Sequence, residues 1–338
     1  MIKTLTSWRG IFALCIVCFH FSMHEFDQMT YAGVTFFFIL SGFLVGKRYS
    51  SIESCQLYYR HRFARLFPLH WFALAGMIVL DLLLIRQFRY GWDLPLHVAL
   101  LQSWVPYQSV YYNYSIHSWF LSSMLFCVIA TPPVLKLIRQ ISQKTAWIAI
   151  IIVCLVTSGA TIVAGETLKS YYYVFPLFRL VDYTLGILLG RALRDCASIP
   201  LTITKSTAIE LGTLAVFAVF IALHASGHSL ALKLENATMW WIPMLLLIVC
   251  FTIVNDQEGL IGKLLTMRPF LWLGEISFEI YILQKLVNNA FCYLIAPFFG
   301  HFGILIYDYS FACTLPLLIV VAWLVHRFFT KPISMLIA

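Results

Sequence analysis

Runs of apolar residues, separated by short polar segments, recur along the whole chain and predict an all-α polytopic membrane protein. A helix needs about 20 mainly apolar residues to cross the hydrocarbon core of a bilayer. The pattern predicts about ten transmembrane helices in a single domain, residues 1–338. The predicted stretches are 8–23, 31–46, 66–85, 118–138, 145–164, 172–190, 207–225, 239–254, 270–296 and 302–326. The apolar segment 93–106 is too short to cross and is predicted to be interfacial or re-entrant.

Composition excludes a soluble protein. Charged residues make up 11% of the chain and hydrophobic residues 61%, whereas an ordinary globular protein has about 25% charged residues. The net charge of +8 would suggest nucleic-acid binding in a soluble chain. In a membrane protein the placement of the charges along the chain matters more than their sum. We therefore expect no nucleic-acid partner.

The distribution of lysine and arginine predicts the orientation. With the N-terminus inside, sixteen of the 23 basic residues fall in inside segments and four in outside segments. This asymmetry follows the positive-inside rule. Both termini are therefore predicted to be cytoplasmic, in agreement with an even number of spans.

The first predicted span contains two ionisable residues, Arg9 and His20. A separation of eleven residues is about three helical turns, so both side chains lie on one face, roughly 16 Å apart along the axis. Such groups at membrane depth usually face a cavity or a partner. A neutral imidazole is suited to act as a general base, but a packing histidine explains the pattern as well. No acidic third ligand accompanies His20 and His24, so we predict no metal site.

Two arginines, Arg62 and Arg65, end the predicted inside loop and share a face if this stretch is helical. Guanidinium groups suit phosphate oxygens, so the pair is a candidate site for a cytoplasmic phosphate-bearing donor. Contact with anionic lipid is the alternative.

Other charges lie within the predicted spans. Arg179 and Asp182 are three residues apart and are predicted to form a structural ion pair. Glu275 and Glu279, four apart, are predicted to share one face of the ninth span. There they would support proton chemistry or pair with arginines from other spans.

Aromatic residues gather in the predicted outer segments. An interfacial belt explains them, and a platform on which sugar rings stack is the functional alternative. They are Trp92, Trp104, Tyr107, Tyr111, Tyr112, Tyr114, Tyr171, Tyr172 and Tyr173.

Six stretches, in order, resemble the acyltransferase 3 family of membrane proteins, which O-acylate bacterial surface glycans. The family's arginine, ten residues and histidine are matched by Arg9 and His20, and its arginine-x-x-arginine motif by Arg62 and Arg65. The other four are 33–43 (GVTFFFILSGF), 117–121 (HSWFL), 179–190 and 273–278 (LGEISF). Thr35 stands where the family often has an acidic residue, and Gln284 where it often has histidine.

The resemblance implies a multi-pass O-acyltransferase in the bacterial cytoplasmic membrane, surrounded by lipid. It implies acyl-CoA, most simply acetyl-CoA, as co-substrate, no permanently bound cofactor, and a surface glycan or lipid-linked oligosaccharide as acceptor. His20 and Arg9 would be catalytic, and Arg62 and Arg65 would bind the donor. Supporting positions are Ser41, Trp119, Glu275 and Glu279. A transporter or flippase of a polar lipid-linked solute, and an acyltransferase for a small molecule or lipid, are the alternatives.

Overall fold

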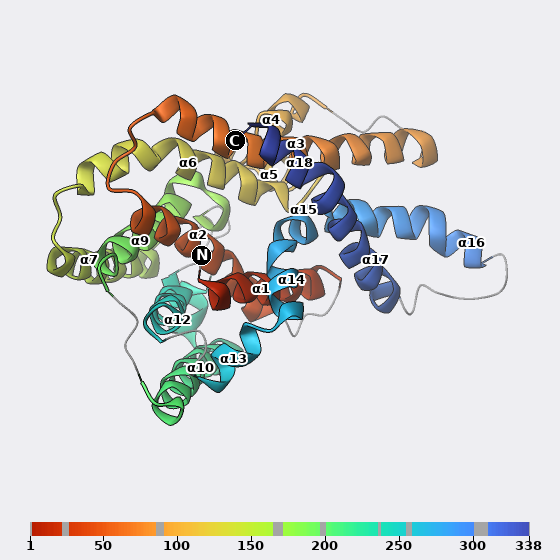
Figure 1. Cartoon of the computed structure of the whole chain (residues 1–338). Coiled ribbons are helices and arrows are strands. Elements are labelled where there is room, and N and C mark those ends of the chain that lie inside the picture. Colours follow the sequence, from red (N-terminus) through yellow and green to blue (C-terminus); the bar gives the residue numbers. More distant parts are fainter. Residues whose placement is uncertain are drawn as a thin grey trace.

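The computed structural model confirms an all-α protein: no β-strand occurs in the residues that it describes (Figure 1). These residues are 2–21, 27–85, 91–164, 172–196, 201–235, 238–254, 259–300 and 310–337. The longer helices are α1 (Lys3–His20), α2 (Asp27–Arg48), α3 (Cys55–Leu80), α6 (Ser118–Ile138), α7 (Gln143–Val163), α9 (Pro176–Ala192), α10 (Ile203–Ala225), α12 (Trp241–Ile253), α14 (Arg268–Glu275), α15 (Ser277–Ala290) and α17 (Ser310–Val325).

Shorter elements connect these helices or extend them. They are η2 (Asp81–Ile85), α4 (Leu94–Val98), η3 (Gln102–Trp104), α5 (Gln108–Tyr111), α11 (Ser229–Leu234), η4 (Thr238–Trp240), α13 (Leu260–Leu265), η5 (Phe291–Ile295), α16 (Ala296–Gly300), η7 (His326–Thr330) and α18 (Lys331–Ile337).

Seven helices in the described part of the chain are long and apolar enough to cross a membrane. They are Asp27–Arg48, Cys55–Leu84, Ser118–Ile138, Gln143–Val163, Ile203–Ala225, Ser277–Phe299 and Phe311–Leu336. The other three predicted spans also contain helices. However, α9 has 17 residues and α12 has 13, and α1 includes Lys3 and Arg9. Residues 302–309 of the tenth predicted span lie outside the described residues.

The closest helix packing joins α2 to α9 through four glycines. A Cβ atom added to Gly42 or Gly46 of α2 would overlap the backbone of α9, and one added to Gly186 or Gly190 of α9 would overlap α2. In a membrane, small residues at a helix interface let the two backbones approach closely. This approach places the C-terminal half of α2, including Ser41, directly against Tyr183 and its neighbours.

A buried ion pair fixes α9, as the sequence predicted. The side chains of Arg179 and Asp182 are fully buried and their charged atoms are 2.5 Å apart. Asp182 also accepts a hydrogen bond from Trp241 Nε1, and Arg179 Nε donates to the Tyr173 carbonyl. These contacts tie α9 to α12, as expected of a structural ion pair.

One sequence prediction about the ninth span is wrong. The helix breaks between α14, which ends at Glu275, and α15, which begins at Ser277. The Ser277 hydroxyl donates to the carbonyl of Gly274 at the break. Glu275 is therefore exposed on one helix while Glu279 is buried on the next, and the two carboxylates do not share a helix face. Periodicity could not reveal this break because the apolar pattern runs through it.

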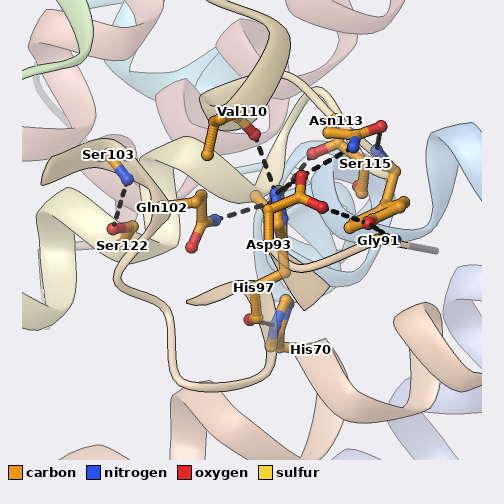
Figure 2. Close-up of polar contacts among 12 residues, drawn as sticks. His70, Gly91, Asp93, His97, Gln102, Ser103, Val110, Asn113, Ser115 and Ser122 are labelled. Atoms are coloured by element: carbon orange, nitrogen blue, oxygen red, sulfur yellow. Dashed lines mark hydrogen bonds and ion pairs between the residues drawn. The ribbon is translucent and has the colours of Figure 1, made fainter. Parts of the chain in front are cut away.

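The segment predicted to be interfacial folds into short helices held by polar contacts (Figure 2). The Asp93 carboxylate accepts hydrogen bonds from Tyr114 Oη and Asn113 Nδ2, at 2.5 and 2.7 Å. His97 Nε2 lies 2.9 Å from the Val110 carbonyl. Burial alone would raise the pKa of Asp93, but hydrogen bonds from Tyr114 and Asn113 outweigh it and hold that pKa below its usual value. The network fixes the chain that leads into α6.

Candidate active site

Three arginines from two helices line one cavity. Arg9 comes from α1, and Arg62 and Arg65 come from the first half of α3. The sequence placed Arg62 and Arg65 at the end of a loop, but α3 already begins at Cys55, so they share a helix face. The cavity has a volume of about 170 Å³. Arg65 is exposed, so solvent reaches the cavity where the arginines lie.

Apolar and hydroxyl-bearing side chains complete this arginine cavity. Ser41, one of the predicted supporting residues, lies in its wall. Its other lining residues are Phe37, Leu40, Leu44, Leu66, Phe120, Met124, Val128, Tyr183, Ser277, Phe278 and Tyr281. A cavity with cationic groups and an apolar interior suits an anionic molecule that carries a short apolar chain.

Glu279 supplies negative charge beside the arginines. Its side chain is 2% exposed, and its carboxylate is close enough to Arg9 and Arg65 to attract both guanidinium groups. One carboxylate oxygen accepts a hydrogen bond from Nδ1 of His326, at 2.8 Å, and the other has no hydrogen-bond partner. Of the two predicted acidic residues, Glu279 is thus the one that the structure brings to the arginines.

His20 lines a second cavity, with a volume of about 270 Å³. It is the last residue of α1 and its side chain is exposed. The separation of eleven positions between Arg9 and His20 corresponds to about 16 Å of helix, and the two residues line different cavities. Trp119, predicted as a supporting residue, belongs to this second cavity and packs on Tyr173 with ring centroids 4.9 Å apart.

The walls of this His20 cavity are mainly aromatic. The remaining lining residues are Ile16, Phe19, Asp27, Thr30, Tyr31, Val34, Tyr112, Ile116, Tyr173 and Tyr281. Of the outer aromatic residues that the sequence singled out, Tyr112 and Tyr173 face this cavity. The predicted residues His24 and Tyr171 lie outside the described residues.

Tyr281 of α15 contributes to both cavities. Its hydroxyl donates to the His117 carbonyl at 3.3 Å, and its ring packs on Phe120 with centroids 5.3 Å apart. The boundary between the cavities is therefore built from α15 and the N-terminal end of α6. Sequence reasoning did not identify Tyr281, because an aromatic residue inside an apolar helix carries no signal of its own.

The described residues contain no group of three or more histidine, cysteine or acidic side chains arranged to hold a metal ion. The nine cysteines are free.

Comparison with known families agrees with the motif pattern. The acyltransferase 3 family, described as an acyltransferase domain, matches residues 2–329, nearly the whole chain. The chain belongs to the acyltransferase 3 family. The resemblance drawn from six short motifs is thereby confirmed.

A curated relative shares this description. The acyltransferase MdmB of Streptomyces mycarofaciens is 29% identical over 225 residues, which is 57% of this chain. The match covers 58% of that relative, so the chain spans little more than half of its length. No solved structure matches the chain.

The two departures from the acyltransferase 3 pattern lie in the protein interior. Thr35 is fully buried on α2. Gln284 is 1% exposed, and its side-chain amide donates to the Tyr281 carbonyl at 2.8 Å. The position where the family often has histidine therefore makes a local hydrogen bond within α15.

Proposed function

We propose that the protein transfers an acyl group, most simply acetyl, from acyl-CoA to a hydroxyl of a cell-surface polysaccharide or its lipid-linked precursor. In this proposal the chain spans the bacterial cytoplasmic membrane about ten times, with both termini in the cytoplasm. The arginine cavity then opens to the cytoplasm and the His20 cavity to the outer side. Membership of the acyltransferase 3 family supports acyl transfer.

The observation that carries the proposal is the pair of cavities with a common wall residue. Arg9, Arg62 and Arg65 line one, His20 lines the other, and Tyr281 contributes to both. A donor and an acceptor that approach from opposite sides of a membrane need two such sites that meet. The main alternative is a transporter or flippase. Such a protein has no thioester donor and so does not need a cationic cavity to bind one.

The donor's phosphates would bind the arginines. Guanidinium groups form paired hydrogen bonds with phosphate oxygens. The acyl thioester would then enter the apolar part of the cavity, toward Tyr281. Because Arg9 shares this cavity and is about 16 Å of helix from His20, we assign it to donor positioning and not to charge stabilisation next to His20.

His20 would act as the general base. One of its ring nitrogens takes the proton of the acceptor hydroxyl while the oxygen attacks the thioester carbonyl. The new C–O bond forms, the C–S bond breaks, and the leaving CoA thiolate takes the proton back from His20. An acyl-histidine intermediate is the alternative route. The aromatic wall of the His20 cavity is suited to stack on a sugar ring, which favours a glycan acceptor over a lipid.

The test uses purified protein in lipid nanodiscs with radiolabelled acetyl-CoA. We expect the parental protein to release or transfer acetyl, and His20→Ala to lose this activity while keeping its thermal unfolding temperature. His228→Gln is the matched control, because His228 is exposed and lines neither cavity. Acetyl transfer by His20→Ala at the parental rate would refute the role of His20.

Two further measurements separate the alternatives. Rapid quenching detects a covalent acetyl label on the protein only if His20 carries the acyl group. Mass spectrometry of the host polysaccharide, with and without this chain, identifies the acceptor: a glycan acetyltransferase changes the mass by one acetyl per modified repeat. An unchanged polysaccharide together with active acetyl-CoA turnover would point to a small-molecule or lipid acceptor.

A further inference from the structure

A buried histidine whose ring makes no hydrogen bond lies next to His20. The side chain of His117 is 3% exposed, and neither of its ring nitrogens has a hydrogen-bond partner. A neutral imidazole carries one N–H donor and one acceptor nitrogen. Leaving such groups buried and unpaired is unfavourable. We therefore expect this ring to gain a partner in the working protein, and its neighbours indicate which one.

The nearest titratable neighbour is His20. The two ring centroids are 4.4 Å apart and the ring planes are nearly perpendicular, at 80°. His117 immediately precedes α6, whereas His20 ends α1. At this separation, rotation about a side-chain torsion brings a nitrogen of one ring to a nitrogen of the other.

The third element at this place is α15. Tyr281 contributes its ring, 5.8 Å from the His117 ring, and its hydroxyl binds the His117 carbonyl. Lys285, one turn further on, acts electrostatically on both imidazoles. Among the described residues, the charged and titratable groups that face His117 are thus His20 from α1 and Lys285 and Tyr281 from α15.

His117 is neutral in this environment. Burial, with smaller contributions from His20 and Lys285, holds the pKa of His117 well below its usual value. A neutral ring offers one acceptor nitrogen, but it does not compete with His20 for the proton of a substrate. It is therefore suited to orient His20 and not to replace it.

We propose that His117 is a positioning residue for His20. The acceptor nitrogen of the His117 ring accepts a hydrogen bond from the N–H of the His20 ring. This inference rests on the proposed function. The hydrogen bond fixes which His20 nitrogen carries hydrogen and which faces the acceptor hydroxyl. When His20 takes the hydroxyl proton, both of its nitrogens carry hydrogen, and the bond to His117 becomes charge-assisted and stronger. The proton itself stays on His20 until the CoA thiolate takes it.

A purely packing role for His117 makes a different prediction. A buried packing ring tolerates replacement by another ring, because removing unpaired polar atoms from an apolar site does not destabilise it. His117→Phe keeps a planar ring and removes both nitrogens. His117→Gln and His117→Asn keep an acceptor oxygen without an imidazole.

The experiment measures steady-state acetyl transfer in nanodiscs as a function of pH. We expect His117→Phe to lower kcat about tenfold, the effect of one hydrogen bond to a charged group, and to leave KM for acetyl-CoA unchanged. The acid limb of its pH profile moves to lower pH, because protonated His20 has lost its acceptor. His117→Gln or His117→Asn restores part of kcat, and His228→Gln behaves like the parent.

Each possible outcome either supports or refutes the positioning role of His117. Parental kcat and a parental acid limb in His117→Phe would overturn the positioning role. If His117→Phe does not fold, the limb is measured on His117→Gln and His117→Asn, where a structural role predicts the parental position. Failure of the proposed function looks different, because the parental protein would then show no acetyl transfer or His20→Ala would retain it.

Discussion

Replacing Gly42 by alanine tests whether the contact between α2 and α9 sets the shape of the arginine cavity. Ser41, beside Gly42, and Tyr183 of α9 both line this cavity. An alanine Cβ at position 42 would overlap the Tyr183 carbonyl oxygen and would lie 2.9 Å from the Tyr183 carbonyl carbon. Since ordinary contact begins at 3.4 Å, the carbonyl carbon alone requires the two helices to separate by about 0.5 Å, and the nearer carbonyl oxygen requires a larger separation.

The expected change in stability follows from two opposing effects. Forcing an extra methyl group into a packed interface costs about 1–3 kcal/mol. The greater helix propensity of alanine offsets about 1 kcal/mol of this at most. We therefore expect Gly42→Ala to lower the thermal unfolding temperature. It should also reduce kcat/KM for acetyl-CoA about tenfold, because displacements near 1 Å in a positioned site have effects of this size.

The assay compares thermal unfolding and acetyl-CoA turnover in the same nanodiscs. Gly159→Ala on α7 is the matched control, because nothing lies within 4 Å of a Cβ at that position. The control has the same helix-propensity gain and no overlap, so its unfolding temperature should stay equal or rise. Equal stability and turnover in the two alanine variants would refute the packing argument.

Three other predictions concern charged side chains. Arg65→Lys loses the paired hydrogen-bond geometry that suits phosphate, so KM for acetyl-CoA should rise about tenfold. Arg60 lies outside the cavity, so Arg60→Lys should match the parent in the same kinetic assay. Glu279→Gln removes the charge that attracts Arg9 and Arg65 and that accepts the His326 hydrogen bond, so the free energy of unfolding of the donor-free protein should fall by up to about 3 kcal/mol. Added CoA should reverse part of this loss in the thermal assay, and no change on adding CoA would contradict the assignment. The depressed pKa of Asp93 means that its hydrogen-bonded carboxylate stabilises the segment above pH of about 4 and that this stabilisation is lost as pH falls through the folded-state pKa. Asp93→Asn should therefore increase the hydrogen-exchange rate of residues 91–117 at pH 7, whereas in the parental protein this rate should increase only in acid. Equal exchange rates in the variant and the parent at pH 7 would contradict the prediction.

The sequence identified Arg62 and Arg65 as a pair because local spacing carries that information. Arg62 and Arg65, three apart, must share a face once the stretch is helical. Arg179 and Asp182 follow the same rule, and their ion pair is present. The pairing of Glu275 with Glu279 failed for the converse reason. A helix break at Ile276 separates the two residues, leaving Glu275 exposed and Glu279 buried, and no change in hydropathy marks the break.

Residues that meet across helices could not be predicted in this way. His117 meets His20, and Tyr281 contributes to two cavities, only because α1, α6 and α15 converge. The glycine spacing in α2 and α9 was a usable signal for close packing, but spacing alone does not identify the partner helix.

The sequence by itself determined the class of protein, its helical character and its family motifs, because hydropathy and spacing along one helix are local properties. The tertiary structure alone decided that Arg9 belongs with Arg62 and Arg65, that His20 lies in a separate aromatic cavity, and that Glu279 is buried while Glu275 is exposed. These outcomes depend on how closely and at what rotation distant helices pack. That packing is set by the sum of many small side-chain contacts, which no single stretch of sequence contains.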